Sequence, residues 1–421
     1  MATLRDRRGA SAVVFASSAI VIMGFVGLAT EAGTWYLGRR DAQNAADAAA
    51  VAGALASIYG ANATTSATSI AAQNGFTAGA NVAVAINTVP VAGANSQIQV
   101  TVSQTMVPLI TSLFGIDPVT IGATAAAQVK SIGSACALAL SGDLRVTGTS
   151  ISSACAFAGN GTSSTAVSVT GALLASTATA VGGCCGAGTV TLSGRPSSPY
   201  HPLTTNPYAA ADALTLPSFS AASCDAIPAA VLVAAVPTIT LVPYNPASPR
   251  AYCSNLVVSA GITVAVPSGT YFFNNASLTV NGGKITCQTT CAPGASYGTT
   301  FVFTGATGSI GTIAITTGWV TLIPLKNNAN FPALNGILFY GRGLGTATVA
   351  AANTAGRQPI GGALYFPYAA LQFTGNTASP SSCLSLVALS LTLYSTSRLA
   401  TTACANYGTT LASMQGARIV Q

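Results

Sequence analysis

The strongest constraint on this chain is an uncharged apolar run near its N-terminus, from Gly9 to Thr30. At about 1.5 Å of helical rise per residue, the run can cross the roughly 30 Å hydrocarbon core of a bilayer. A cleaved secretory signal is the alternative, but its apolar core is usually only about 7–15 residues long and is followed by a small-residue cleavage site. The length of the run therefore favours a retained membrane-spanning helix.

The charges that flank this run predict its orientation. Three arginines and one aspartate precede it, and the next cations lie about two helical turns beyond its end. Basic residues close to a span are retained on the cytoplasmic side. We therefore expect a cytoplasmic N-terminus, with the bulk of the chain across the membrane. The flanking charges are Arg5, Asp6, Arg7, Arg8, Arg39 and Arg40.

The segment that follows, residues 34–60, is rich in alanine and lacks proline, which favours a helix. Its small residues recur four positions apart, so they lie on adjoining helix faces and let another backbone approach closely. Two interpretations are open: this face is an assembly surface for helices of other subunits, or the helix lies on a domain of its own chain. The residues concerned are Ala45, Ala46, Ala49, Ala50, Gly53 and Ala54.

This N-terminal pattern resembles the TadE/TadG-like family of Flp pilus-assembly proteins. The resemblance covers roughly residues 7–56 and rests on RRGA, the apolar span, an acidic residue followed by Ala-Gly, and AADAAAVAGA. It implies a single-pass inner-membrane anchor in a tight-adherence pilus system, with the bulk of the chain periplasmic or exposed at the cell surface. The matching residues are Arg8, Gly9, Glu31, Gly33, Arg40, Gln43, Ala45, Ala46, Asp47, Ala48, Ala49, Ala50, Gly53 and Ala54.

Two positions depart from the family pattern. Glu31 stands where the family usually has aspartate. Smaller, pseudopilin-like members are cut after a glycine that is followed five residues later by glutamate, whereas Gly9 is followed at that offset by Val14. The resemblance therefore implies the longer TadG-like branch, which stays anchored. Its implied partners are other pilus-assembly or pseudopilin subunits, contacted through the N-terminal helix.

The chain as a whole is expected to be mainly β, in four parts. A cytoplasmic tip and transmembrane anchor occupy residues 1–33 and the alanine-rich assembly helix residues 34–60. A small α+β module follows at 61–132, because NVAVAINTVPV and SQIQVTVSQTMV alternate like paired strands. The remainder, 133–421, is a cysteine- and glycine-rich β region. Within it, the proline-rich stretch 194–219 is expected to be an extended segment that crosses between two parts.

The β region repeats at about 20 residues. CALALSGDLRVTGTSISSAC and CLSLVALSLTLYSTSRLATTAC each place a cysteine at both ends of a strand-turn-strand unit. A repeat of this length without helical periodicity predicts a disulfide-braced, right-handed parallel β-helix, or solenoid. A β-sandwich is the alternative, because strands at regular intervals fit it as well.

All ten cysteines follow residue 135, which indicates disulfides in an oxidising compartment. A solenoid coil brings a residue beside the one about 20 positions later, at a strand spacing of about 4.7–4.9 Å that a disulfide can bridge. Sequence alone does not fix the connectivity. The candidate pairs are Cys136 with Cys155, Cys383 with Cys404, Cys224 with Cys253 and Cys287 with Cys291, and the adjacent Cys184 and Cys185 bond to each other or to separate partners.

The β region offers little for catalysis. Its acidic residues are Asp143, Asp212 and Asp225, whereas glycoside hydrolysis usually needs a carboxylate pair and β-helical lyases bind Ca²⁺ through several carboxylates. Only a cluster of these three in one groove would support a membrane-tethered polysaccharide-active enzyme. His201, the single histidine, is expected to be a surface linker residue. We therefore expect no enzyme activity, no cofactor and no metal site.

A polysaccharide-binding protein without catalysis is a further alternative. It would need exposed aromatic side chains along one face, and the candidates are Tyr271, Phe272, Tyr365 and Tyr368, for which burial in the core is the favoured expectation. The net charge of +7 fits a few solvated cations spread over the surface, or a mildly cationic face for anionic envelope or surface glycans. Basic residues do not cluster with aromatic ones, so nucleic-acid binding is not expected.

These features together predict a structural or adhesive component of a tight-adherence pilus system. The N-terminal helix anchors the chain in the membrane and contacts partner subunits. The disulfide-braced β region projects outward and contacts the pilus, the envelope or surface glycans.

Overall fold

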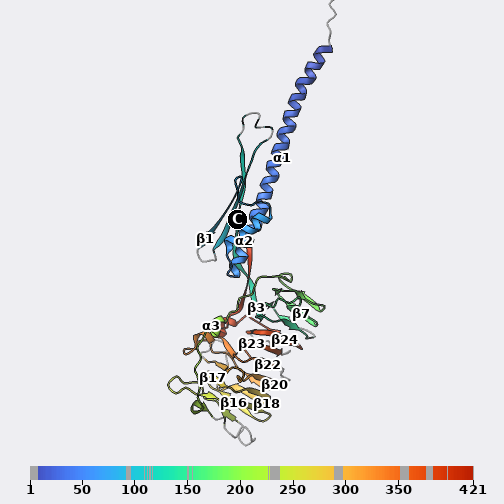
Figure 1. Cartoon of the computed structure of the whole chain (residues 1–421). Helices are drawn as coiled ribbons and strands as arrows, with labels where there is room; N and C mark the ends of the chain where they lie inside the picture. Colours follow the sequence, from blue (N-terminus) through green and yellow to red (C-terminus); the bar gives the residue numbers. More distant parts are fainter. Residues whose placement is uncertain are drawn as a thin grey trace, which may run out of the picture. The chain divides into compact units, whose positions relative to one another are not determined.

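A computed structural model describes the chain, which divides into two compact units: unit 1 (Met1–Lys130 and Gly416–Gln421) and unit 2 (Ser131–Gln415) (Figure 1). The fold is mainly β, with one long N-terminal helix. The residues described are all except 1–7, 92–95, 109, 111, 113–114, 116, 149–150, 154, 226, 228–237, 289–296, 351–359, 376–382, 396 and 421.

Unit 1 combines two helices with an antiparallel sheet. The apolar run and the alanine-rich segment form one uninterrupted helix, as expected from the absence of proline between them. Strand β2 lies between β1 and β3 and pairs antiparallel with both. The elements are α1 (Arg8–Ile58), α2 (Ala63–Gln73), β1 (Val82–Val89), β2 (Gln97–Met106) and β3 (Val119–Ala139).

The core of unit 1 lies between the helices and the sheet. β2 alternates buried and half-buried residues, so Ile98, Val100 and Val102 form one apolar face. α2 contributes Ala67 and Ala71, both fully buried. α2 starts at Asn62, whose side-chain oxygen accepts a hydrogen bond from the Thr65 backbone N–H at 3.0 Å, and this satisfies one of the free donors of the first turn.

Unit 2 consists of strands joined by turns, in a large parallel sheet that is curled into a half-barrel and a second, four-stranded parallel sheet. Its first part contains β4 (Leu144–Val146), β5 (Ile151–Ser153), β6 (Ala156–Gly159), β7 (Val167–Val169), β8 (Ala172–Ala175), β9 (Ala178–Ala180), β10 (Cys184–Cys185) and β11 (Thr189–Leu192). A stretch with the short helices α3 (Ala209–Asp212) and η2 (Ala221–Ser223) follows.

The second part of unit 2 contains most of its long strands, and the last of them, β26, ends in unit 1. The strands of this part are β12 (Cys224–Asp225), β13 (Thr238–Thr240), β14 (Ala251–Tyr252), β15 (Leu256–Ser259), β16 (Thr263–Val266), β17 (Gly269–Asn274), β18 (Leu278–Cys287), β19 (Thr299–Thr304), β20 (Ile313–Thr321), β21 (Ile337–Gly341), β22 (Gly345–Ala350), β23 (Gly362–Thr374), β24 (Leu384–Tyr394), β25 (Ser397–Leu399) and β26 (Ala412–Val420), with the short helices η4 (Pro332–Leu334) and α4 (Cys404–Tyr407).

Two long ladders of parallel strands run through unit 2. The first ladder joins β12, β14, β17, β19, β21, β23, β24, β3, β6 and β9 in that order. The second joins β15, β18, β20, β22, β23, β24, β4, β7 and β10. A β-sandwich consists of antiparallel strands, whereas the described strands of unit 2 pair in parallel, so the β-sandwich alternative is wrong.

The order of strands in these ladders differs from their order in the sequence. β24, near the C-terminal end, pairs with β3 and β4, so the earliest and latest strands of unit 2 meet in the middle of the stack. From β3 the ladder continues through β6 to β9, and Ser198 forms a bridge to Thr179 there. The chain must then return to the opposite end, where β12 pairs with β14.

Residues 198–219 make this return and are called the strap below. Near its start, Thr204 exchanges two hydrogen bonds with Asn160, which follows β6. Farther along, Asn206 donates to the Tyr365 hydroxyl of β23 at 2.8 Å. At its end the Phe219 ring packs against Phe272 of β17, with centroids 5.2 Å apart. The strap therefore follows the first ladder from β6 to β17.

The strap covers an apolar column on the outside of the first ladder. The residues of this column pair with one another from strand to strand, and all are at most 1% exposed. They are Phe272, Val302, Tyr340, Tyr365, Val387, Leu138 and Ala158. This burial accounts for three of the four aromatic candidates of the sequence analysis, since Tyr271 is also 1% exposed and Tyr368 alone reaches 42%.

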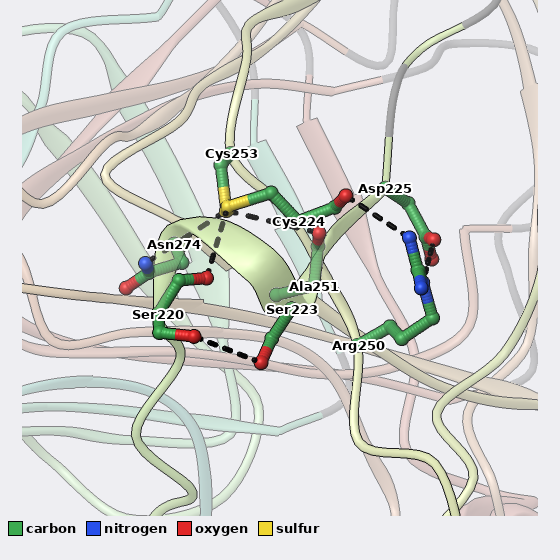
Figure 2. Close-up of a disulfide and its surroundings, with 8 residues drawn as sticks. All are labelled: Ser220, Ser223, Cys224, Asp225, Arg250, Ala251, Cys253 and Asn274. Carbon is green, nitrogen blue, oxygen red and sulfur yellow. Dashed lines mark hydrogen bonds and ion pairs between the residues drawn. A yellow bond between two sulfur atoms is a disulfide. The ribbon is translucent and has the colours of Figure 1, made fainter.

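Disulfides fasten neighbouring turns of unit 2. Cys224–Cys253 joins β12 to the end of β14, and in Figure 2 the Arg250–Asp225 ion pair lies beside it. Arg250 also donates from Nη2 to the Cys224 carbonyl at 3.1 Å. The other described disulfides are Cys136–Cys155, Cys383–Cys404 and the adjacent pair Cys184–Cys185. Cys291, the expected partner of Cys287, lies outside the described residues.

Candidate membrane anchor and its junction with unit 1

The first half of α1 has the surface of a membrane-spanning helix. Its large apolar side chains are open, with Phe15 at 77%, Met23 at 71% and Phe25 at 69% exposure. The apolar window of this helix has a mean hydropathy of 2.3, and only 6% of it is buried. A soluble helix buries such a stripe against a core, whereas lipid accepts it uncovered. This half of α1 is therefore suited to the interior of a bilayer.

The second half of α1 has the opposite character. Ala45, Ala46, Ala49 and Ala50 are fully buried, and Ala54 is 1% exposed, all within the core of unit 1. The interpretation of this face as an assembly surface for partner helices is therefore wrong, because the unit's own sheet and α2 already occupy it. The alternative, a helix lying on its own domain, describes the structure. Small side chains are needed here because they bring α1 close to β2.

Gly53 shows how close this approach is. A Cβ atom at this position would lie 2.8 Å from Cγ2 of Ile98 in β2 and 3.2 Å from the Ala63 carbonyl oxygen of α2. Two further glycines of α1 meet the same hairpin: Gly38 faces Ile121 and Met106, and Gly27 faces Ile110. These isoleucine contacts were not found from the sequence. The signal available was the spacing of the glycines, 11 and 15 residues, which is close to whole numbers of helical turns.

The remaining motif residues of α1 are exposed or bond within the helix. Gly33 has nothing within 4 Å of a built Cβ, and Arg40 is exposed. Gln43 donates from Nε2 to Oδ1 of Asp47 at 2.8 Å, which links two motif positions one helical turn apart. Gly9 lies in α1, and its surroundings are outside the described side chains.

Glu31 is the one acidic residue of this junction that is buried, at 7% exposure. Its Oε1 accepts a hydrogen bond from the Ile110 backbone N–H at 3.1 Å. A carboxylate removed from water must be compensated by donors, and this bond supplies one of them. The motif acid therefore binds the connection between β2 and β3 to the end of the apolar run.

A cleft of about 240 Å³ opens next to this bond. Its walls are mostly apolar, and the Glu31 carboxylate stands among them. The cleft is lined by Gly27, Thr30, Glu31, Thr34, Trp35, Met106, Val107, Pro108 and Ile110. Aromatic and apolar groups with a few polar atoms at the end of an apolar span are typical of the membrane interface.

The three aspartates of unit 2 bind separate sets of residues. Asp143 pairs with Arg145 at 3.2 Å, and Asp225 pairs with Arg250. Asp212 of α3 accepts from the tyrosine hydroxyls of the strap-covered column. No described group of three His, Cys, Asp or Glu side chains is arranged to hold a metal ion. The three carboxylates thus lack the shared partners that would mark one catalytic groove.

Asp212 anchors the strap. It accepts hydrogen bonds from the hydroxyls of Tyr340 and Tyr365, and Arg342 donates to its backbone carbonyl at 2.7 Å. Burial raises the pKa of the Asp212 carboxyl above its usual range, against the opposing effects of these hydroxyls and of the Arg342 charge. Burial also raises the pKa of both tyrosines, so they remain protonated donors.

His201 does not lie on the surface as expected. It is 8% exposed, and its backbone N–H donates to the Ala180 carbonyl of β9 at 2.8 Å. Its Nδ1 lies 2.9 Å from the Pro202 carbonyl oxygen. Burial lowers the pKa of the imidazole. The expectation of a surface linker residue is therefore wrong, because the strap packs on the ladder here.

A comparison with known families identifies the N-terminal part of the chain. No curated protein and no solved structure matches the sequence. The family model for TadE/G-like Flp pilus-assembly proteins matches residues 9–57, which cover nearly all of α1. It includes the exposed apolar half, Glu31 and the buried alanines. Residues 9–57 of this chain are thus similar to the TadE/G-like Flp pilus-assembly family.

Proposed function

We propose that this protein is a structural, membrane-anchored component of a tight-adherence, Flp-type pilus assembly system, in the longer TadG-like branch of its family. One observation carries the proposal: the segment that matches the family is also the helix whose apolar half is left uncovered by the rest of unit 1. The large unit 2 and the residue Val14 at the position of the pseudopilin glutamate favour an anchor that stays in the membrane.

In this proposal α1 crosses the inner membrane once, with the N-terminal arginines in the cytoplasm and unit 2 in the periplasm or at the cell surface. The charge bias around the span supports this orientation. Disulfides in unit 2 support an oxidising compartment. Other pilus-assembly subunits would contact α1 through its uncovered half, because the alanine face is filled by unit 1 itself.

We further propose that unit 2 is a right-handed parallel β-solenoid that serves as a contact surface. The outward column of the second ladder supports this role, because its members are partly exposed and mostly carry hydroxyl or amide groups. Such groups can form hydrogen bonds with a pilus, an envelope polymer or a glycan without catalysing a reaction. The column pairs Val257, Thr279, Ala314, Thr348, Gln372, Thr392, Arg145, Ser168 and Cys185 from strand to strand.

A non-enzymatic role is part of the same proposal. The separate partners of Asp143, Asp212 and Asp225 support it, since a glycoside hydrolase needs two carboxylates on one bond. The burial of Tyr271, Phe272 and Tyr365 removes the aromatic platform that the polysaccharide-binding alternative requires.

The test combines topology with assembly. A photo-crosslinking residue at Phe25, which is exposed on α1, should join the full chain to other pilus-assembly subunits in living cells. Protease added to spheroplasts should digest unit 2 but leave an N-terminal tag protected. Deletion of the protein should abolish surface filaments. Unchanged filaments after deletion, or a unit 2 protected from external protease, would overturn the proposal.

A further inference from the structure

The hairpin of β2 and β3 lies along α1 over a long distance. Three glycines of the helix mark the contact, and each faces an isoleucine of the hairpin: Gly53 meets Ile98, Gly38 meets Ile121 and Gly27 meets Ile110. The order is reversed between helix and β2, so the strand runs antiparallel to α1. The hairpin therefore returns from the buried alanines toward the apolar run.

The two elements agree in length over this distance. From Gly53 to Gly38 the helix rises about 22 Å, at roughly 1.5 Å per residue. From Ile98 to Met106, which faces Gly38 at the end of β2, the strand covers about 26 Å, at roughly 3.3 Å per residue. Beyond the strand, Ile110 faces Gly27, so the connection between β2 and β3 reaches the level of Gly27. This residue lies inside the uncharged run that ends at Thr30.

The connection between β2 and β3 is apolar and uncharged, like the part of α1 beside it. Val107 is 71% exposed, and Pro108 beside it is buried. The sequence from Met106 to Ile116 reads MVPLITSLFGI and has no charged residue, and the first charge after it is the exposed Asp117. An apolar side chain this open is costly in water and is favoured where lipid can cover it.

Glu31 provides a hydrogen-bond acceptor for a backbone N–H of this connection, which membrane burial would otherwise leave unpaired. A backbone N–H that leaves water without a partner is costly in an apolar medium. The carboxylate accepts the Ile110 N–H at 3.1 Å, so this donor is satisfied next to the apolar run. Trp35, a residue type that favours the interface, lines the same cleft.

We propose that the β2–β3 connection, represented by Val107, Pro108 and Ile110, is a second membrane contact that inserts into the outer interfacial region of the bilayer beside α1. The inference rests on the membrane anchoring of the proposed function. It assigns a bilayer as the partner of this tip, because the tip continues the uncovered apolar surface of α1. Anchor and tip together hold unit 1 at two points on the membrane.

The test measures the depth of single fluorescent probes in the full chain, reconstituted in phosphatidylcholine vesicles. One free cysteine is introduced at a time and labelled with an environment-sensitive dye, in the substitutions Val107→Cys, Ser112→Cys, Phe25→Cys and Asn87→Cys. Ser112 is a second exposed position of the tip. Phe25 reports the span, and Asn87 of β1 pairs with Gln99, near the far end of the hairpin. Quenching is compared for lipids with a nitroxide near the headgroup and at mid-chain.

Support requires a blue-shifted emission at Val107 and Ser112 that the headgroup nitroxide quenches, with Phe25 quenched and Asn87 unaffected. A Val107 probe that behaves like Asn87 while Phe25 is quenched overturns the inference and leaves the anchor intact. Loss of quenching at Phe25 as well refutes the anchor and the inference together. A blue shift at Val107 without lipid quenching means that protein covers the tip, through a second copy, and also overturns the inference.

Discussion

The two units cover an apolar sheet face in different ways. In unit 1, α1 lies on Ile98, Val100 and Val102 with alanines and glycines. In unit 2, the strap lies on Phe272, Tyr340 and their neighbours with aromatic rings and polar groups. The cover of unit 1 is a regular helix that runs along β2, whereas the cover of unit 2 is extended and crosses several strands.

The difference follows from the backbone. A helix satisfies its own peptide groups, so it needs only small side chains to approach a sheet closely. An extended strap has no such internal bonds, so side chains must hold it. Two rings of the strap pack on the ladder, Tyr208 on Tyr365 and Phe219 on Phe272. The strap also accepts hydrogen bonds, at the Thr204 carbonyl from Asn160 and at the Asp212 carboxylate from Tyr365. We therefore expect a helix on a sheet to be destabilised by substitutions that enlarge its small side chains. The strap should be destabilised by substitutions that remove its large side chains or its hydrogen-bonding residues.

The largest effect is expected for Phe272→Ala, which removes the ring against which Phe219, Tyr244 and Phe331 pack. Truncation of a fully buried phenylalanine costs about 3–5 kcal/mol in the free energy of unfolding. Urea unfolding of the full chain in detergent, followed by Trp319 in a Trp35→Phe background, reports on unit 2. The matched control Tyr368→Ala removes a 42% exposed ring and should change little. Equal losses in both variants would mean that the strap does not cover this column.

A similar loss is expected when the strap's far end is released by the double change Cys224→Ser and Cys253→Ser. The disulfide closes 29 residues of sequence separation, and for such a loop the chain-entropy model gives about 3–4 kcal/mol. The same Trp319 measurement applies, with Arg250→Gln as the control that removes the neighbouring ion pair and the hydrogen bond to the Cys224 carbonyl but leaves the disulfide intact. A double variant no less stable than this control would show that the strap is held without the disulfide.

A smaller effect, confined to unit 1, is expected for Gly53→Leu. The new side chain would meet Ile98 and the Ala63 carbonyl, and overpacking of this kind costs about 1–3 kcal/mol. Gly33→Leu is the matched control, because it makes the same change on the same helix where nothing lies within 4 Å. Unfolding followed by Trp35 in a Trp319→Phe background measures both. If Gly33→Leu lowered the free energy of unfolding more than Gly53→Leu, the face of α1 that packs on β2 and α2 would be wrongly assigned.

The smallest effect concerns the pH dependence of the strap anchor. Burial raises the pKa of Asp212, so its contribution to stability is fully present below the unfolded pKa and is lost as the pH rises through the folded pKa. Between pH 4 and neutrality, the unfolding free energy of unit 2 should thus fall less steeply in Asp212→Asn than in the unchanged protein. Urea titrations across this range, with Asp143→Asn as control, decide the point. If the unfolding free energy had the same pH dependence in Asp212→Asn and in Asp143→Asn, the role assigned to Asp212 would be contradicted.

The sequence predicts much of α1 and of the strand spacing. An uncharged run and a proline-free alanine segment predict a helix directly, and the structure has one helix across both. The predicted repeat of about 20 residues also appears in the register, where Leu138 pairs with Ala158. These are local properties of composition and period, which a single sequence records.

What a small-residue face packs against is not a local property. Ala49 and Gly53 permit close approach of any backbone, so their spacing alone fits a partner helix and a sheet equally well. Only the position of Ile98, about 45 residues away in the sequence, decides between them. The same limit applies to His201, whose burial depends on where the strap lies on β9. The Ile110–Glu31 bond joins residues 79 apart and has no signal in either segment alone.

The position of β3 in the middle of the parallel stack has a consequence for export. In the proposed topology the chain crosses the membrane from its N-terminus, so within unit 2 the strands from β3 to β11 emerge first, with the edge that later receives β24 still unpaired. An open edge of this kind is a template for pairing with other chains. It stays open until residues 384–394 have been delivered, so folding of unit 2 is completed by nearly the last segment to be made. A truncation before Leu384 leaves this edge uncovered, and pulse-labelled chains of that length should be protease-sensitive and prone to aggregate. The sequence order of unit 2 therefore makes complete export a condition of its solubility.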